Sequence, residues 1–264
     1  MSGSITLENR FGVNKMELIS LKYAIFVIVL LVLYYCFPKK YRWYVLLAGS
    51  MAYYVIICKW YVLFIIFTIC TTYGSTIWID KLLKKQNAIV KSHKEDWDRQ
   101  TRKDYKEKGR KKRVAVMLFA LLCNFGILAF LKYIPYAGEL GLLLPLGISF
   151  YTFQSMGYVM DVYREIVEPE KNFLKVALFV SFFPQIIQGP IAIYDKLAGQ
   201  LYEGQSLRLE NLQKGALLVL WGVMKKLVIA DRAVNIINFV MDKPMDFSGT
   251  YVFFAAVVYA LQLY

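Results

Sequence analysis

Eight blocks of mostly apolar residues, separated by short polar or charged segments, dominate the chain. Most are close to the roughly 20 residues that a helix needs to cross the hydrocarbon core of a bilayer. Backbone groups inside a bilayer must be hydrogen-bonded within the protein, so such blocks are expected to be helical. The pattern predicts an all-α, polytopic transmembrane protein with one multi-span membrane domain over residues 1–264. The blocks run approximately over residues 18–37, 41–58, 60–79, 114–131, 141–160, 173–194, 215–233 and 250–264.

Composition supports this interpretation and excludes several others. Hydrophobic residues make up 58% of the chain, whereas soluble domains contain about 45–50%. All four cysteines lie in apolar blocks without metal-ligand spacing, so we expect neither a bound metal nor a disulfide framework. The sequence contains no Gly-x-Ser-x-Gly elbow and no phosphate-binding glycine loop, which argues against an independent hydrolase or kinase.

Most of the net charge of +13 is concentrated in one segment. Residues 81–113 contain 14 Lys and Arg against five Asp and Glu. Cytoplasmic loops of membrane proteins carry such an excess, so we interpret the segment as a basic cytoplasmic loop. Contact with anionic lipid or nucleic acid is the alternative, and we expect no nucleic-acid partner.

The basic residues also predict the orientation of the spans. Lys39, Lys40 and Arg42 mark a second cytoplasmic turn, which places the N-terminus outside a multi-pass plasma-membrane protein. The last block, 250–264, is short for a span and ends without polar or basic residues. We therefore expect the chain to be the N-terminal part of a longer protein.

Residues 181–191, "SFFPQIIQGPI", break the helical pattern inside an apolar block. Proline removes a backbone donor, and glycine adds backbone freedom. Broken backbone survives in hydrocarbon only where protein or a water-filled cavity surrounds it. We predict a re-entrant or interrupted segment that lines a cavity, with a kinked spanning helix as the alternative. The candidate residues are Pro184, Gln185, Gln188, Gly189 and Pro190.

A second segment, "LPLGISFYTFQSMGYVMDVYR" (144–164), places polar side chains in an apolar block. Four of them follow the i, i+3, i+4, i+7 spacing of one helix face: Tyr151, Gln154, Ser155 and Tyr158. Such a polar face either joins helices or lines a path for substrate. Asp161 and Arg164 follow at its end and complete the candidate set there.

A third segment, "KGALLVLWGVMKKLVIADRA" (214–233), contains charges within an apolar block. Lys225, Lys226 and Asp231 are the candidates. Charges inside a membrane helix are costly and often functional, although long lysine side chains can also extend to the membrane surface.

These motifs, with "FVSFFPQIIQGPIAIYDKL" (179–197) as the second of three in order, resemble the membrane-bound O-acyltransferase family. The resemblance covers the chain from about residue 18 and is strongest over 144–233. It is nearest to the bacterial branch that contains the alginate O-acetyltransferase membrane subunit and the teichoic acid D-alanyltransferase.

The resemblance implies a helical fold in which funnels from both membrane faces meet at a narrow tunnel. An acyl group, acetyl in alginate-type O-acetylation, would pass from a cytoplasmic thioester donor to hydroxyls of a cell-envelope or extracellular polysaccharide. The donor would be a substrate similar to acetyl-CoA or an acyl carrier protein, with no bound cofactor. An extracytoplasmic partner protein would complete the transfer. D-alanyl transfer to teichoic acid is the alternative within the family.

The family's catalytic histidine is expected downstream of a motif that would begin where this chain ends, at "ALQLY" (260–264). His93, the one histidine in the sequence, lies in the charged 81–113 segment and is interpreted as solvated. We therefore expect no catalytic residue within the chain and no activity from the chain alone. A transporter component and a non-catalytic fragment are the alternatives outside the enzyme class.

Overall fold

The computed structural model describes residues 21–93, 96–133, 145–242 and 244–263, and these residues form helices and no strand. The all-α prediction is confirmed. The chain divides into two compact units, one ending at Gln205 and one beginning at Ser206. That residues 1–264 belong to a single membrane domain stays a prediction.

The first unit contains eight described α-helices, most of which overlap the apolar blocks of the sequence. Two 3₁₀ turns, η2 (Lys39–Tyr41) and η3 (Lys59–Tyr61), separate the first three helices. The helices are α1 (Leu21–Cys36), α2 (Arg42–Cys58), α3 (Val62–Ser92), α4 (Arg99–Tyr133), α6 (Ile148–Tyr163), α7 (Phe173–Ser181), α8 (Phe183–Gln188) and α9 (Tyr194–Tyr202).

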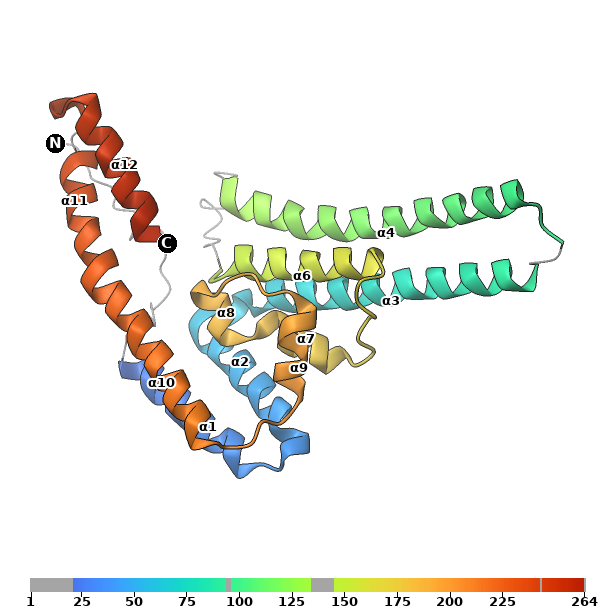
Figure 1. Ribbon diagram of the computed structural model, residues 1–264, viewed down its shortest axis with the longest axis horizontal. Helices are drawn as coiled ribbons and strands as arrows, with labels where there is room; N and C mark the ends of the chain where they lie inside the picture. The colour runs from blue at the N-terminus through green and yellow to red at the C-terminus, as the bar shows by residue number, and fades with distance from the viewer. Residues whose placement is uncertain (1–20, 94–95, 134–144, 243, 264) are drawn as a thin grey trace. The chain divides into compact units, whose positions relative to one another are not determined.

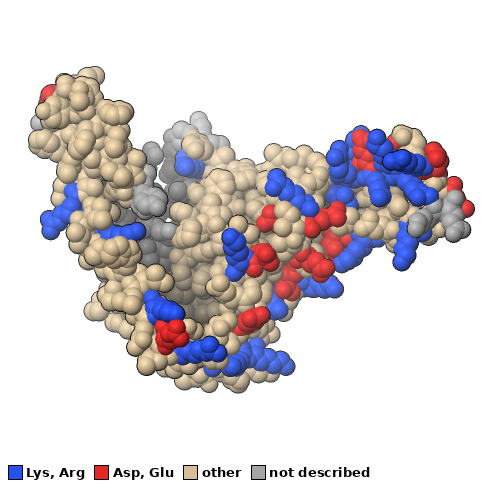
Figure 2. Space-filling model, viewed as in Figure 1, with Lys and Arg blue, Asp and Glu red and all other residues tan. Residues whose placement is uncertain are grey.

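Helices α3 and α4 are the longest, with 31 and 35 residues. Both pack against α6 and against each other, and both extend beyond it (Figure 1). The segment 81–113, interpreted as a loop, is therefore helical for most of its length. Lys, Arg, Glu and Gln are good helix formers, and i,i+4 ion pairs such as Asp80–Lys84 and Glu107–Lys111 add support. Figure 2 shows Lys and Arg side chains gathered over this extension.

Apolar side chains fall into two groups. Large residues such as Tyr53, Ile65 and Phe179 form a buried core between the helices. Many others, including Ile56 and Leu122, are exposed on the helix surfaces, as expected for side chains that face lipid. Two described helical stretches are long and apolar enough to cross a membrane by length and composition, Lys39–Ser92 and Arg99–Tyr133, and three apolar helices are shorter.

The second unit is a helical hairpin. Helix α10 (Leu209–Met224) continues through η4 (Lys225–Ala230), a π-helical stretch, into α11 (Asp231–Met241). A 3₁₀ turn, η5 (Pro244–Asp246), leads to α12 (Gly249–Leu263), which packs against α11.

Candidate functional site

The apolar block 173–194 is interrupted in the structure. Helix α7 ends at Ser181, Phe182 adopts φ −59° and ψ 107°, and α8 begins at Phe183 with Pro184 in its first turn. At a rise of about 1.5 Å per residue, α7 is about 14 Å long and α8 about 9 Å. Even end to end they are shorter than the roughly 30 Å hydrocarbon core. The predicted interruption is confirmed, and the cavity that this segment is expected to line stays a prediction.

Side chains from two other helices satisfy the backbone at this break. In an uninterrupted helix, the Phe183 N–H would donate to the Phe179 carbonyl. Here the Gln154 side-chain amide of α6 donates to that carbonyl at 2.8 Å. The Phe183 N–H donates to Ser50 Oγ of α2 at 3.4 Å. The carbonyl and the N–H that would form the missing helical bond therefore each have another hydrogen-bond partner, as burial away from water requires.

Gly147 allows the broken segment to pack closely against the start of α6. It precedes the helix with φ 69°, a left-handed conformation that glycine adopts without steric cost. A Cβ at this position would lie 2.4 Å from the Ile186 side chain of α8 and closer still to the Ile186 carbonyl oxygen. A side chain here would push α8 away from α6.

The four residues of the predicted polar face of α6 are all buried. Tyr151, Gln154, Ser155 and Tyr158 are each at most 3% exposed. Tyr158 stacks on Tyr194 with ring centroids 4.2 Å apart, and its hydroxyl accepts from the Glu170 N–H at 2.8 Å. Gln154 and Tyr158 thus join α6 to the α7 region, which is the first of the two roles predicted for the polar face. A substrate path along this face stays a prediction.

Several side-chain hydroxyls on the helices around the break are buried without a hydrogen-bond partner. Among the described residues these include the side-chain oxygens of Ser155, Ser181, Thr72 and Tyr53, on α6, α7, α3 and α2. An unpaired buried polar group costs about 1–3 kcal/mol. Such groups in a native fold need an explanation, and a polar ligand is one.

Tyrosine hydroxyls from other helices fix the start of α7. Tyr73 of α3 donates to the Lys171 carbonyl at 3.0 Å, and Tyr202 of α9 donates to the Lys175 carbonyl at 2.9 Å. The Asn172 side chain caps α7 by accepting from the Leu174 N–H at 2.9 Å. Burial raises the pKa of the Tyr202 phenol above its ordinary value. The helix is therefore held at its start as well as at its broken end.

The residues around the second proline form a local turn. Gln185 donates through its amide to the Pro190 carbonyl at 3.2 Å, and the Gly189 N–H donates to the Gln185 carbonyl at 3.0 Å. The Gln185 Oε1 atom is buried without a partner. Pro190 itself is exposed, and the side chain of Gln188 lies outside the described residues.

The remaining candidates lie elsewhere. Asp161 is half-buried in the last turn of α6, and Arg164, which follows the helix, is exposed. Lys225 and Lys226 lie in the π-helical stretch η4, and Asp231 begins α11; all three belong to the second unit. Lys225 Nζ lies 5.8 Å from the centroid of the Trp221 ring.

His93 has the surroundings expected of a surface residue. It is exposed just after α3, and its ring stacks on Trp97 with centroids 4.9 Å apart. Its Nδ1 atom lies 3.0 Å from the Ser92 hydroxyl. Nothing in these contacts connects it with the broken helix.

Sequence reasoning did not select three residues that shape the break: Ser50, Gly147 and Ser181. Gly147 stands in the quoted motif 144–164, and its place immediately before an expected helix was an available signal. Ser50 and Ser181 are single small polar residues in apolar blocks. Small polar residues are common throughout membrane helices, so their positions alone do not reveal which of them lie at the break.

The fold and the break define the chain as an all-α membrane protein with an interrupted helix supported by polar side chains. Comparison with curated proteins confirms the family resemblance of the motifs. The chain is 31% identical over 186 residues to the peptidoglycan O-acetyltransferase of Helicobacter pylori, covering 56% of this chain and 35% of that protein. No family model matches the chain, and no solved structure matches it.

Alginate O-acetylases are also similar. The probable alginate O-acetylase AlgI of Pseudomonas syringae pv. tomato is 35% identical over 124 residues, covering 46% of this chain and 23% of that protein. The AlgI of Pseudomonas aeruginosa is 33% identical over 125 residues, covering 47% and 23%. The chain thus spans about a third or less of the length of these relatives.

Proposed function

We propose that the chain forms part of a membrane-bound O-acyltransferase that moves an acetyl group from a cytoplasmic thioester donor to hydroxyls of a cell-envelope polysaccharide. The observation that carries this proposal is the similarity to a peptidoglycan O-acetyltransferase and to alginate O-acetylases. Both kinds of relative are named for O-acetyl transfer to a polysaccharide, which favours acetyl over the D-alanyl alternative.

In the proposed reaction, a polysaccharide hydroxyl attacks the thioester carbonyl. The new C–O bond forms, the C–S bond breaks, the thiol leaves, and the hydroxyl proton passes to a general base. His93 is not assigned as this base, because it is exposed and its ring stacks on Trp97 after α3. The donor is acetyl-CoA or an acylated carrier protein, and an extracytoplasmic partner completes the transfer by bringing the polymer hydroxyl to the acyl group.

Gln154 and Ser50 are positioning residues in this proposal. They satisfy the carbonyl of Phe179 and the N–H of Phe183, and so stabilise the break between α7 and α8. A break maintained in this way can border a path through the bilayer where a continuous helix would close it. The unpartnered hydroxyls of Ser155 and Ser181 are the polar groups that such a path would use.

The proposal is tested in native membranes that contain the protein. Membranes receive acetyl-CoA labelled in its acetyl group, and the label that mild alkali releases from purified envelope polysaccharide is measured. Gln154→Leu is expected to lower this label by about tenfold or more, because displacement of the break misplaces the reacting groups. Gln200→Leu, the same substitution at an exposed position of α9, is expected to leave it unchanged.

Other results decide between the alternatives. Release of D-alanine by alkali, without acetyl label, would show that the transferred group is D-alanyl and not acetyl. Transport of a labelled solute without a covalent product would support a transporter component. Membranes that transfer acetyl groups equally well with and without the protein would contradict the acyltransferase proposal.

A further inference from the structure

A pocket lies between the extended parts of α3 and α4, beside the end of α6, away from the broken helix. Its volume is about 440 Å³. Helix α4 contributes Lys103, Lys106, Arg110 and Arg113, which follow i, i+3, i+7, i+10 spacing and so share one face. The remaining lining residues are Leu83, Gln86, Asn87, Glu107 and Glu165.

The lining carries four cationic side chains and two carboxylates. One carboxylate, Glu107, already pairs with Lys111 at 3.3 Å, and Lys111 is not part of the lining. The other, Glu165, is 53% exposed at its side chain and lies 3.7 Å from the Arg113 guanidinium. The cations of the pocket are therefore only partly neutralised by the protein.

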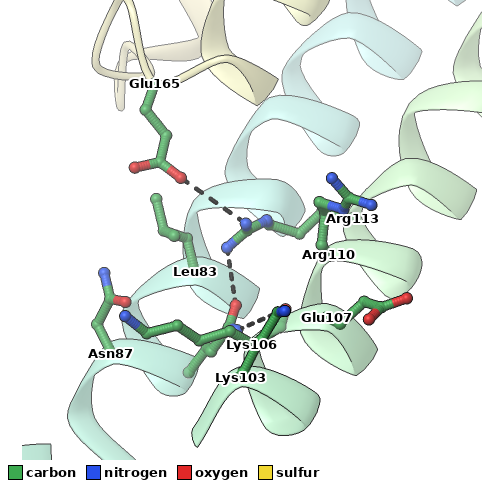
Figure 3. Close-up of a pocket in the computed structure, with 9 residues that line it drawn as sticks. Leu83, Asn87, Lys103, Lys106, Glu107, Arg110, Arg113 and Glu165 are labelled. Atoms are coloured by element: carbon green, nitrogen blue, oxygen red, sulfur yellow. Dashed lines mark hydrogen bonds and ion pairs between the residues drawn. The ribbon is translucent and has the colours of Figure 1, made fainter. Parts of the chain in front are cut away.

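Arg113 is the most buried of the four cations that line this pocket. Its side chain is 10% exposed. Figure 3 shows its guanidinium joined by a dashed line to Glu165, and its Nη1 donates to Gln86 Oε1 at 2.9 Å. Gln86 in turn donates to the Lys106 carbonyl at 2.9 Å. The guanidinium is thus held in a fixed orientation, with its Nε buried and unpartnered.

Gly109 permits this arrangement. A Cβ on Gly109 would lie 2.6 Å from the Gln86 side chain. The glycine therefore lets Gln86 sit against α4, where it can reach both Arg113 and the Lys106 carbonyl. Burying a guanidinium is costly unless an opposite charge compensates it, and the single long contact to Glu165 is weak compensation.

From these observations we infer that the pocket binds a phosphate group. A fixed arginine with three exposed cations around a cavity is a typical arrangement for phosphate recognition. Arg113 directly precedes the apolar residues 114–131, so the pocket lies at the expected membrane surface. The phosphate source that this position favours is the headgroup of an anionic phospholipid, and a soluble phosphate compound is the other source. This inference does not depend on the proposed acyl transfer.

The test is lipid binding by the purified full chain in detergent, measured by native mass spectrometry. Phosphatidylglycerol, an anionic phospholipid, is titrated against phosphatidylcholine, whose headgroup has no net charge. We expect selective retention of phosphatidylglycerol. Lys106→Gln with Arg110→Gln, two exposed side chains of the pocket, should lower that affinity by about tenfold or more.

A matched variant separates the pocket from general surface charge. Lys108→Gln with Lys112→Gln removes the same charge from exposed positions of α4 outside the pocket lining. We expect this variant to retain phosphatidylglycerol with less than about a twofold loss, within the effect of distant screened charges. Both double variants should unfold at the temperature of the wild-type protein, since neither alters a buried side chain.

Inorganic phosphate distinguishes the two sources. Saturable phosphate binding that the Lys106/Arg110 variant loses, without selectivity for phosphatidylglycerol, would support a phosphate site for a soluble compound. Equal losses in the two double variants would overturn the inference, because they would show a non-specific basic surface. Absence of binding by either probe would overturn it as well. These measurements involve no acyl transfer, so the failure of one proposal leaves the other intact.

Discussion

The side-chain amide of Gln154 donates to the backbone carbonyl of Phe179 across 2.8 Å, where a continuous helix would use the N–H of Phe183. A side chain of α6 thus donates to the carbonyl that loses its helical donor at the break after α7. The bond connects two structural features that the sequence suggests separately, the polar face of α6 and the proline-containing segment. It makes the interruption a stable part of the fold.

Replacing Gln154 by leucine is expected to destabilise the protein by about 1–3 kcal/mol, because the Phe179 carbonyl would be buried without a donor. Equilibrium unfolding in mixed detergent micelles measures this change. Gln200→Leu, at an exposed position of α9, is the matched control and should stay within about 0.5 kcal/mol of wild type. Equal effects of the two substitutions would contradict the role given to the Gln154–Phe179 bond.

A second prediction concerns Gly147. An alanine there must adopt φ 69° and would bring its Cβ to 2.4 Å from the Ile186 side chain. Gly147→Ala should therefore lower the thermal unfolding temperature and separate α8 from α6. Gly157→Ala serves as control on the same helix, because a Cβ at Gly157 meets no atom within 4 Å. In a helix interior, alanine is favoured over glycine by roughly 0.5–1 kcal/mol, so this control should be neutral or stabilising.

The main elements follow from local properties of the sequence. Pro184 predicts the break because it has no N–H, and the spacing of Tyr151 to Tyr158 predicts a shared face from helix geometry alone. The partners in space do not follow. Ser50 and Phe183 are 133 positions apart, and their contact depends on how α2, α7 and α8 pack.

The helical extension of α3 and α4 shows a different limit. The charge of residues 81–113 suggests a loop, yet Glu107 and Lys111 stand four positions apart and form an ion pair in a helix. Helix propensity and charge spacing in this segment both predict a helix. The sequence does not predict the contact between Arg113 and Gln86, because that contact depends on how the two long helices align in space.

Tyr202 yields a prediction about pH. Its hydroxyl donates to the Lys175 carbonyl, and burial raises the pKa of its phenol. Above the ordinary pKa of about 10, the unfolded state loses this proton while the folded state keeps it, so the stability that Tyr202 contributes falls as pH rises. Tyr202→Phe should cost about 1 kcal/mol near neutral pH, the value of one hydrogen bond.

The cost of Tyr202→Phe should shrink above about pH 10. Unfolding of wild type and variant is compared at a series of pH values, so that titration of other groups cancels in the difference. A cost that stays constant with pH would show that the phenol titrates in the folded state at its ordinary pKa, and a cost that grows would show a folded-state pKa below that value.

The last prediction uses the strained backbone beside the phosphate pocket. Glu165 adopts φ 61°, one of two non-glycine residues with positive φ among the described residues. A left-handed conformation costs a residue with a Cβ about 1 kcal/mol or more, and glycine avoids this cost. Glu165→Gly should therefore be about 1 kcal/mol more stable than Glu165→Ala. Both variants remove the same carboxylate from the pocket, so their difference reports the backbone alone.

Glu168 provides the control for this comparison. It is exposed a few residues further on and is not among the described residues with positive φ. There the order should reverse or vanish, because glycine adds freedom to the unfolded chain without relieving strain. Equilibrium unfolding of all four variants in the same micelles makes the comparison. If alanine matched or exceeded glycine at position 165 as well, the positive φ would carry no strain, and Glu165 would be held beside Arg113 at no cost to the backbone.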